Sequence, residues 1–82
     1  MYTVYILRTS KNTLYTGITN NLKKRLKVHA SKTKNSSKYV RSFESFTLVY
    51  TEKLNNKSEA LKRELEIKKL TKIKKEALIS KI

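Results

Sequence analysis

The sequence predicts an α/β (α+β) fold, in which helices flank a small three-stranded, mainly antiparallel sheet. Three runs rich in β-branched and aromatic residues, at 2–8, 13–18 and 46–51, predict the strands. Leucine and alanine recur at helical spacing in the segments between and after them. The expected order is β-β-α-(α)-β-α-α. Because 82 residues leave room for one domain, we expect residues 1–82 to form a single unit.

The first two strands are expected to form a hairpin, and its loop length decides which side chains share a face. A loop of two residues would place Tyr5 and Tyr15 on opposite faces of the sheet. A loop of three residues, 10–12, would place them on one face, with the only glycine, Gly17, opposite Tyr5. Asn12 tolerates the left-handed conformation that the last position of such a loop needs. The sequence therefore favours the three-residue loop.

The helix after the hairpin is expected to be capped by Thr19 and Asn20 and to run to about Ala30. Leu22, Leu26 and Ala30 recur every four residues, which predicts that they form its buried stripe.

The second half of the chain predicts a loop, a strand and two helices. Residues 31–38 contain no apolar residue and are expected to form a basic loop, followed by a short helix or turn at 39–43. Asn56, with Glu59 three residues later, has the spacing of a capping box and predicts a helix to about Leu70, with Ser58 as the alternative cap. The residues expected to be buried in that helix and in a last helix capped by Thr71 are Ala60, Leu61, Leu65, Ile67, Ile73, Ala77 and Leu78.

The charge balance indicates a polyanionic partner. Twenty Lys and Arg residues oppose six acidic residues, which gives a formal net charge of +14. Nucleic acid is the partner we expect, because neutralised phosphates release counterions. The alternative is a general lysine-rich composition. The lysines expected to contact nucleic acid are Lys23, Lys24, Lys27, Lys32, Lys34 and Lys38.

The residue types that are missing narrow the possible functions. Without cysteine the chain can form neither a disulfide scaffold nor a thiolate metal site, which fits a reducing cytoplasm. No apolar run approaches the roughly 20 residues that span a bilayer, so we expect no membrane partner. All six acidic residues are Glu, so we expect any catalytic metal to be a single ion with few protein ligands.

Glu64 and a pair on the first helix are candidates for chemistry. A carboxylate on an apolar helix face must be neutral, paired with a cation or bound to a metal, and a salt bridge to one of the many lysines is the alternative reading for Glu64. At about 100° per residue His29 falls inside the buried stripe and Arg25 at its edge. As i, i+4 neighbours, Arg25 and His29 can address one ligand together. Arg25 could hold a phosphate oxygen, and His29 could position a nucleophile.

These residues together resemble the GIY-YIG nuclease superfamily, and within it the small stand-alone bacterial proteins. Thr3-Val4-Tyr5 stands for the GIY element and Tyr15-Thr16-Gly17 for YIG, with Thr3 and Thr16 replacing the usual Gly and Ile. The segment 21–26 resembles the arginine helix of the family, with His29 one turn later. Glu64 falls where the family keeps its metal-binding glutamate.

The resemblance implies hydrolysis of a phosphodiester bond, with DNA as the substrate we expect. Tyr5 would act as general base or relay, Tyr15 and His29 would orient the water, and Arg25 would hold the scissile phosphate. Glu64 would bind one Mg²⁺ or Mn²⁺, an ion that keeps several waters and needs few protein ligands. Two alternatives remain open: a non-catalytic nucleic-acid-binding protein that retains the fold, and a ribosome-associated protein. The oligomeric state is not indicated.

Overall fold

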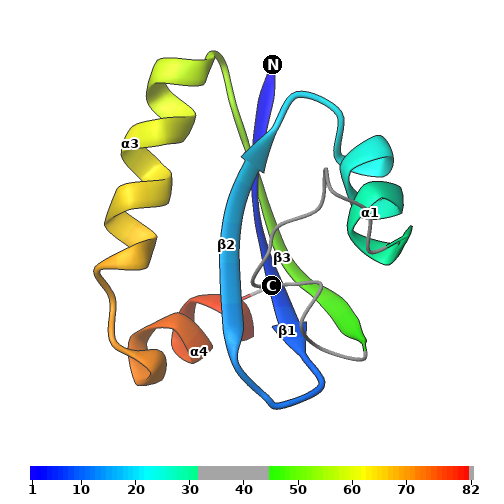
Figure 1. The fold of residues 1–82 in the computed structure, drawn as a ribbon. Coiled ribbons are helices and arrows are strands. Elements are labelled where there is room, and N and C mark those ends of the chain that lie inside the picture. Colours follow the sequence, from blue (N-terminus) through cyan, green and yellow to red (C-terminus); the bar gives the residue numbers. More distant parts are fainter. Residues whose placement is uncertain (32–44, 82) are drawn as a thin grey trace.

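The computed structural model of the chain describes residues 1–31 and 45–81, which form the predicted α+β fold (Figure 1). The elements in chain order are β1 (Tyr2–Thr9), β2 (Leu14–Thr19), α1 (Leu22–Ser31), β3 (Phe46–Leu54), α3 (Lys57–Lys68) and α4 (Lys72–Ser80). Both neighbours of β1 run antiparallel to it, in the strand order β2-β1-β3. The short helix or turn predicted at 39–43 and the loop at 32–38 lie outside the described residues.

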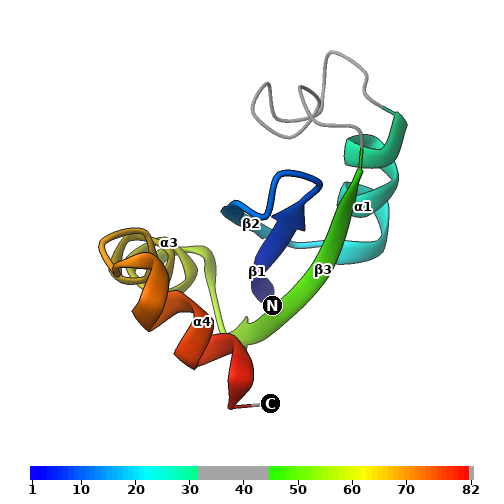
Figure 2. The ribbon, with the colours of Figure 1, turned by 90° about the horizontal axis from the view of Figure 1, so that it is seen from below.

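The central strand β1 divides the core into two layers. Val4 and Ile6 face α3 and α4, and they pack with the buried Ala60 and Ile67. Tyr5, from the other face of the strand, packs with α1 and with the start of β3, as Leu7 does. Figure 2 shows α1 on one side of the sheet and both C-terminal helices on the other. This alternation places Tyr5 in the layer beneath α1.

The hairpin has the predicted three-residue loop. Tyr5 pairs with Gly17, and Leu7 pairs with Tyr15, so the two tyrosines share a face of the sheet. Asn12 adopts the left-handed conformation, with φ of 62°. The backbone N–H of Asn12 donates to the carbonyl of Thr9 at 2.9 Å, and this hydrogen bond closes the turn. The prediction that this turn brings both tyrosines to one face is therefore confirmed.

The third strand is longer than predicted and carries an irregularity. It runs to Leu54 rather than ending at Thr51. Its register against β1 shifts between Ile6 and Leu7, which leaves one extra residue, Val49, on β3. As a result Val49 and its neighbour Tyr50 both pack against the core beneath α3 and α4.

The first helix ends about where predicted, at Ser31, but differs from its prediction in its cap and in one residue of its buried stripe. Asn21 is the residue whose side chain caps the helix, because its Oδ1 accepts from the amide of Lys24 at 3.1 Å. Ala30 is exposed, so the predicted stripe is wrong at this position. Leu22, Leu26 and His29 instead form the buried sector at i, i+4 and i+7, and Ala30 lies about 70° from its centre.

The caps of the two C-terminal helices are confirmed, although several predicted core positions are wrong. Asn56 accepts from the amide of Glu59, and Thr71 accepts from the amide of Lys74. Ala60 and Ile67 are buried and Leu78 is partly buried, as predicted. The predicted core residues that are exposed are Leu61, Leu65, Ile73 and Ala77. These side chains lie outside the sectors of α3 and α4 that face the sheet.

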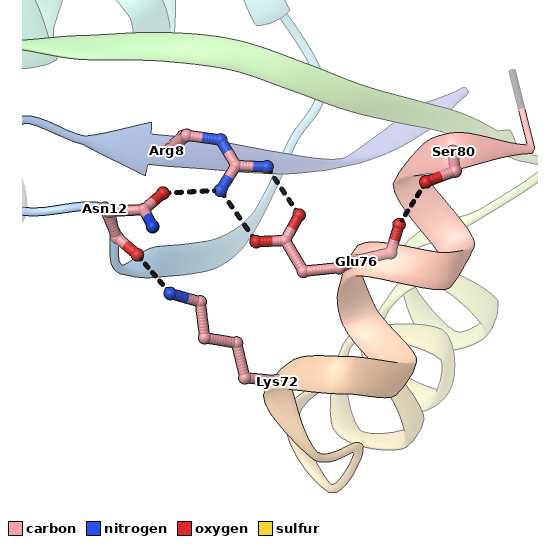
Figure 3. Close-up of polar contacts among 5 residues, drawn as sticks. All are labelled: Arg8, Asn12, Lys72, Glu76 and Ser80. Atoms are coloured by element: carbon pink, nitrogen blue, oxygen red, sulfur yellow. Dashed lines mark hydrogen bonds and ion pairs between the residues drawn. The ribbon is translucent and has the colours of Figure 1, made fainter.

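A polar clamp of four residues joins the hairpin tip to α4 (Figure 3). Both terminal nitrogens of Arg8 donate to the Glu76 carboxylate, and its Nη1 also donates to Asn12 Oδ1 at 2.8 Å. The Nζ of Lys72 donates to the backbone carbonyl of Asn12. Two-point contact between guanidinium and carboxylate fixes orientation as well as distance. The clamp therefore positions α4 against β1 and the loop of the hairpin.

Replacing Glu76 with Gln is expected to lower the melting temperature at neutral pH but not in acid. The hydrogen bonds from Arg8 lower the pKa of Glu76 below its ordinary value of 4.5. A lowered folded-state pKa means that the stabilisation is present above that ordinary value and is lost as the pH falls through the folded-state pKa. Thermal denaturation of both proteins across this range checks the prediction. Glu66→Gln, at an exposed carboxylate, is the control, and an equal pH response in both variants would contradict the role of the clamp.

Candidate functional site

The centre of the candidate site is a buried hydrogen bond between a tyrosine and a histidine. Tyr5 Oη lies 3.0 Å from His29 Nε2. The tyrosine is 1% exposed, and the histidine is fully buried, as its predicted place in the stripe of α1 requires. Because β1 is the central strand and α1 packs over it, both groups are held by rigid elements rather than by loops.

Two further aromatic rings enclose the imidazole. The ring of Tyr15 lies 5.8 Å from His29 and 6.4 Å from Tyr5, measured between centroids. Phe46, the first residue of β3, meets His29 edge-on at 6.0 Å. The hairpin, α1 and β3 thus converge on one imidazole and exclude water from its faces.

Arg25 acts on both members of the hydrogen-bonded pair. Burial raises the pKa of Tyr5 to about 12, although the hydrogen bond and charge of Arg25 oppose this shift. The charges of Tyr15 and Glu64 raise it further. Burial, followed by the positive charge of Arg25, lowers the pKa of His29 below 6.5. At neutral pH the pair therefore consists of a neutral phenol and a neutral imidazole.

Glu64 lies on α3, across the sheet from α1, and its link to the site is the effect of its charge on the pKa of Tyr5. Helix α3 packs against β2, the edge strand that carries Tyr15 and Gly17, and the Glu64 charge is strong enough there to raise the pKa of Tyr5. Its side chain is 15% exposed. One carboxylate oxygen of Glu64 lies 3.5 Å from the Nζ of Lys68, one helical turn later. A salt bridge to a lysine was the alternative to a functional role that the sequence allowed for Glu64.

Gly17 is required by a close approach rather than by its backbone conformation. Its φ is not positive. A Cβ at this position would lie 2.6 Å from Tyr5 Oη and 3.2 Å from Tyr15 Cε2. The absence of a side chain therefore allows the Tyr5 ring to lie across β2.

The acidic side chains near the site limit the kind of metal ion that it could hold. Within residues 1–31 and 45–81, no three His, Cys, Asp or Glu side chains are grouped closely enough to hold an ion. Glu64 is the carboxylate whose charge reaches Tyr5. Mg²⁺ is commonly bound through one or two carboxylates together with water and substrate phosphate.

The predicted nucleic-acid-binding lysines divide into two groups. Lys23, Lys24 and Lys27 are exposed on α1 and can meet a polyanion. The remaining three, Lys32, Lys34 and Lys38, lie outside the described residues. In the described part of the chain, no helix has the length and apolar character needed to cross a membrane.

Sequence reasoning missed three residues around the site. Phe46 was assigned only to a strand, and its contact with His29 depends on the pairing of β3 with β1. Lys68 could have been found from its i, i+4 spacing to Glu64. Thr16 was noted only as a departure from the YIG motif, but it is buried and lines, with Lys68, a pocket between β2 and the two C-terminal helices.

Comparison with known proteins agrees with this geometry. The model of the GIY-YIG catalytic domain matches residues 1–77. The chain belongs to the GIY-YIG family. Its relatives include a UPF0213 protein of Oceanobacillus iheyensis, 46% identical over 76 residues that span 93% of this chain and 86% of that protein. A UPF0213 protein of Clostridium perfringens is 49% identical over 77 residues, which span 94% of this chain and 81% of that protein.

A solved structure shares the fold of this GIY-YIG chain. The solution NMR structure of a UPF0213 protein from Bacillus halodurans matches with a TM-score of 0.62 at 41% identity. The match covers 98% of this chain and 84% of that one. The predicted family is therefore confirmed, and membership of a nuclease family makes nucleic acid the class of substrate.

Proposed function

We propose that this GIY-YIG protein hydrolyses phosphodiester bonds in DNA with the help of one divalent metal ion, Mg²⁺ or Mn²⁺. The observation that carries the proposal is the 3.0 Å contact between Tyr5 Oη and His29 Nε2, with Arg25 acting on both groups. A prearranged proton acceptor and a nearby cation support in-line attack of water on a phosphodiester.

The proton path begins at the attacking water. A phenol with a pKa of about 12 is almost entirely protonated at neutral pH, so Tyr5 alone is a poor base. The neutral imidazole of His29 can instead accept the Tyr5 proton at Nε2 while Tyr5 Oη takes the proton of the water. Tyr5 then acts as a relay and His29 as the final acceptor, which favours the relay among the two expected roles of Tyr5.

Arg25 and Tyr15 complete the protein's part in the reaction. The guanidinium of Arg25 would hold a non-bridging oxygen of the scissile phosphate and offset the charge that grows during attack. Tyr15, whose ring lies against both Tyr5 and His29, would orient the water. Glu64 would hold the metal ion, which supplies charge stabilisation for the leaving 3′ oxygen.

Loss of the Glu64 carboxylate or of the Arg25 guanidinium is expected to reduce DNA cleavage about 100-fold or more, since each removes charge stabilisation from the transition state. The measurement is cleavage of plasmid and branched DNA with Mg²⁺ or Mn²⁺, compared with EDTA, for wild type, Glu64→Gln and Arg25→Ala. Glu66→Gln and Lys62→Ala remove equal charges from exposed positions of α3 and are the controls. Equal trace activity in all five proteins would overturn the enzyme proposal.

The ion pair between Glu64 and Lys68 favours a second candidate function. A carboxylate already neutralised by an ammonium 3.5 Å away has less attraction for a metal ion, as in a binding protein that keeps the nuclease fold. This alternative predicts salt-sensitive DNA binding that Glu64→Gln leaves unchanged, together with no cleavage of any substrate.

A further inference from the structure

A pocket outside the Tyr5–His29 pair lies between β2 and the two C-terminal helices. Its volume is about 360 Å³. Its walls are Leu14, Tyr15 and Thr16 from β2, Lys68 from α3 and Lys75 from α4. The lining residues thus include two lysines, one threonine, a leucine and a tyrosine.

The hydroxyl of Thr16 is the unusual group in this pocket. Thr16 is 4% exposed, and its Oγ1 has no hydrogen-bond partner among the residues that the structure describes. The pairing of β2 with β1 turns its side chain toward α3 and α4, on the same face as Ile18. A buried hydroxyl without a partner destabilises the folded protein, so its presence indicates a ligand that accepts or donates a hydrogen bond.

The charge in the pocket identifies the kind of ligand. Lys68 is partly neutralised by Glu64. Within the described residues Lys75 has no carboxylate at ion-pair distance, and its neighbour Glu76 is engaged by Arg8. An ammonium group together with a hydroxyl donor suits an anion with several acceptor oxygens, which is the chemistry of a phosphate group.

We propose that this pocket binds a backbone phosphate of the nucleic-acid strand, next to the phosphate that is cleaved, through Lys75 Nζ and Thr16 Oγ1. The inference rests on the nuclease function proposed above. The pocket adjoins the candidate site at two points: Tyr15 lines both, and Lys68 contacts Glu64. The substrate is therefore a polynucleotide strand held at two successive phosphates, rather than a mononucleotide.

Binding of a short DNA duplex in EDTA tests the pocket without cleavage. Lys75→Ala is expected to weaken binding several-fold and to reduce the slope of log K against log salt by about 0.9, the value for one lost phosphate contact on duplex DNA. Lys74→Ala, at the exposed neighbouring lysine of α4, is the matched control and is expected to change the slope less. Equal effects of the two variants would overturn the assignment.

Thr16→Val supplies an independent test because it has nearly the same shape and no charge change. We expect its melting temperature to equal or exceed that of wild type, since the variant removes an unpartnered buried hydroxyl. We also expect several-fold weaker DNA binding with an unchanged salt slope. Binding equal to that of wild type would overturn the role of Thr16.

An NMR titration distinguishes a strand phosphate from a free anion. The amides of Thr16 and Lys75 are expected to shift with the duplex and to respond only weakly to inorganic phosphate. If inorganic phosphate alone shifts them as strongly, the pocket is a free-anion site and the strand assignment is wrong. Failure of the nuclease function would be recognised separately, as cleavage that Glu64→Gln and Arg25→Ala do not change.

Discussion

A single methyl group added at Gly17 is expected to abolish cleavage and to lower stability. The Cβ of Gly17→Ala would lie 2.6 Å from Tyr5 Oη and 2.7 Å from Tyr5 Cζ. Tyr5 is 1% exposed and bonded to His29, so its ring cannot turn out into solvent without breaking this hydrogen bond. Overpacking of this kind costs about 1–3 kcal/mol. Any relaxation of the clash must move the phenol oxygen away from the imidazole, so we expect cleavage to fall more than about 100-fold.

Thermal denaturation and single-turnover cleavage measure the two effects of Gly17→Ala. In a domain of this size, each kcal/mol corresponds to roughly 4–8 °C in melting temperature. The double variant Gly17→Ala/Tyr5→Leu removes the atoms that clash, so it is expected to recover much of the lost stability but no cleavage. Normal cleavage by Gly17→Ala alone would show that the close approach of Tyr5 to β2 has no part in the reaction.

The features that the sequence predicted correctly depend on neighbouring residues in the chain. Asn12 limits the loop to a conformation that sets the pairing of the hairpin, and this pairing places Tyr5 opposite Gly17. Asn56 and Thr71 cap helices because their side chains reach amides three residues later. Such local geometry can be worked out without knowledge of the rest of the fold.

The errors arise where adjacent residues offer similar local options or where a tertiary contact decides. Thr19 and Asn20 are both good caps, but Thr19 Oγ1 accepts from the backbone amide of Asn21, and Asn21 caps the helix that begins at Leu22. Ile73 belongs to an apolar pattern, yet it is 82% exposed. Helix α4 is oriented by Glu76 and its contact with Arg8, 68 positions earlier in the sequence, which no periodicity can indicate.

In the candidate site, the location of the residues could be predicted from the sequence, but their protonation could not. The joint location of Tyr5, Tyr15 and His29 followed from strand pairing and helical spacing, and the structure brings them together. The protonation of these groups could not be predicted, because it depends on burial. Burial raises the pKa of Tyr5 and lowers that of His29, and this difference alters which residue is suited to accept a proton at neutral pH.

The pH dependence of cleavage is expected to follow His29 rather than Tyr5. Because the pKa of His29 is lowered below 6.5, the rate should rise as the imidazole loses its proton in mildly acidic solution and should level off near neutrality. If the Tyr5 phenolate were the base, the rate would instead keep rising tenfold per pH unit toward about 12. Single-turnover rates measured at saturating metal concentration distinguish these two profiles.

The variant Tyr5→Phe distinguishes the proton-transfer role of the Tyr5 hydroxyl from the packing role of its ring. Tyr5→Phe keeps the aromatic ring in the layer beneath α1 and is expected to reduce the plateau rate about 10²–10⁴-fold, the usual contribution of a positioned proton-transfer group. Tyr50→Phe is the matched control, because this phenol bonds to Glu52 in the layer on the other side of the sheet. A wild-type plateau in Tyr5→Phe would remove the phenol from the proton path. His29, whose Nε2 lies 3.0 Å from Tyr5 Oη, would then have to accept the proton of the water directly.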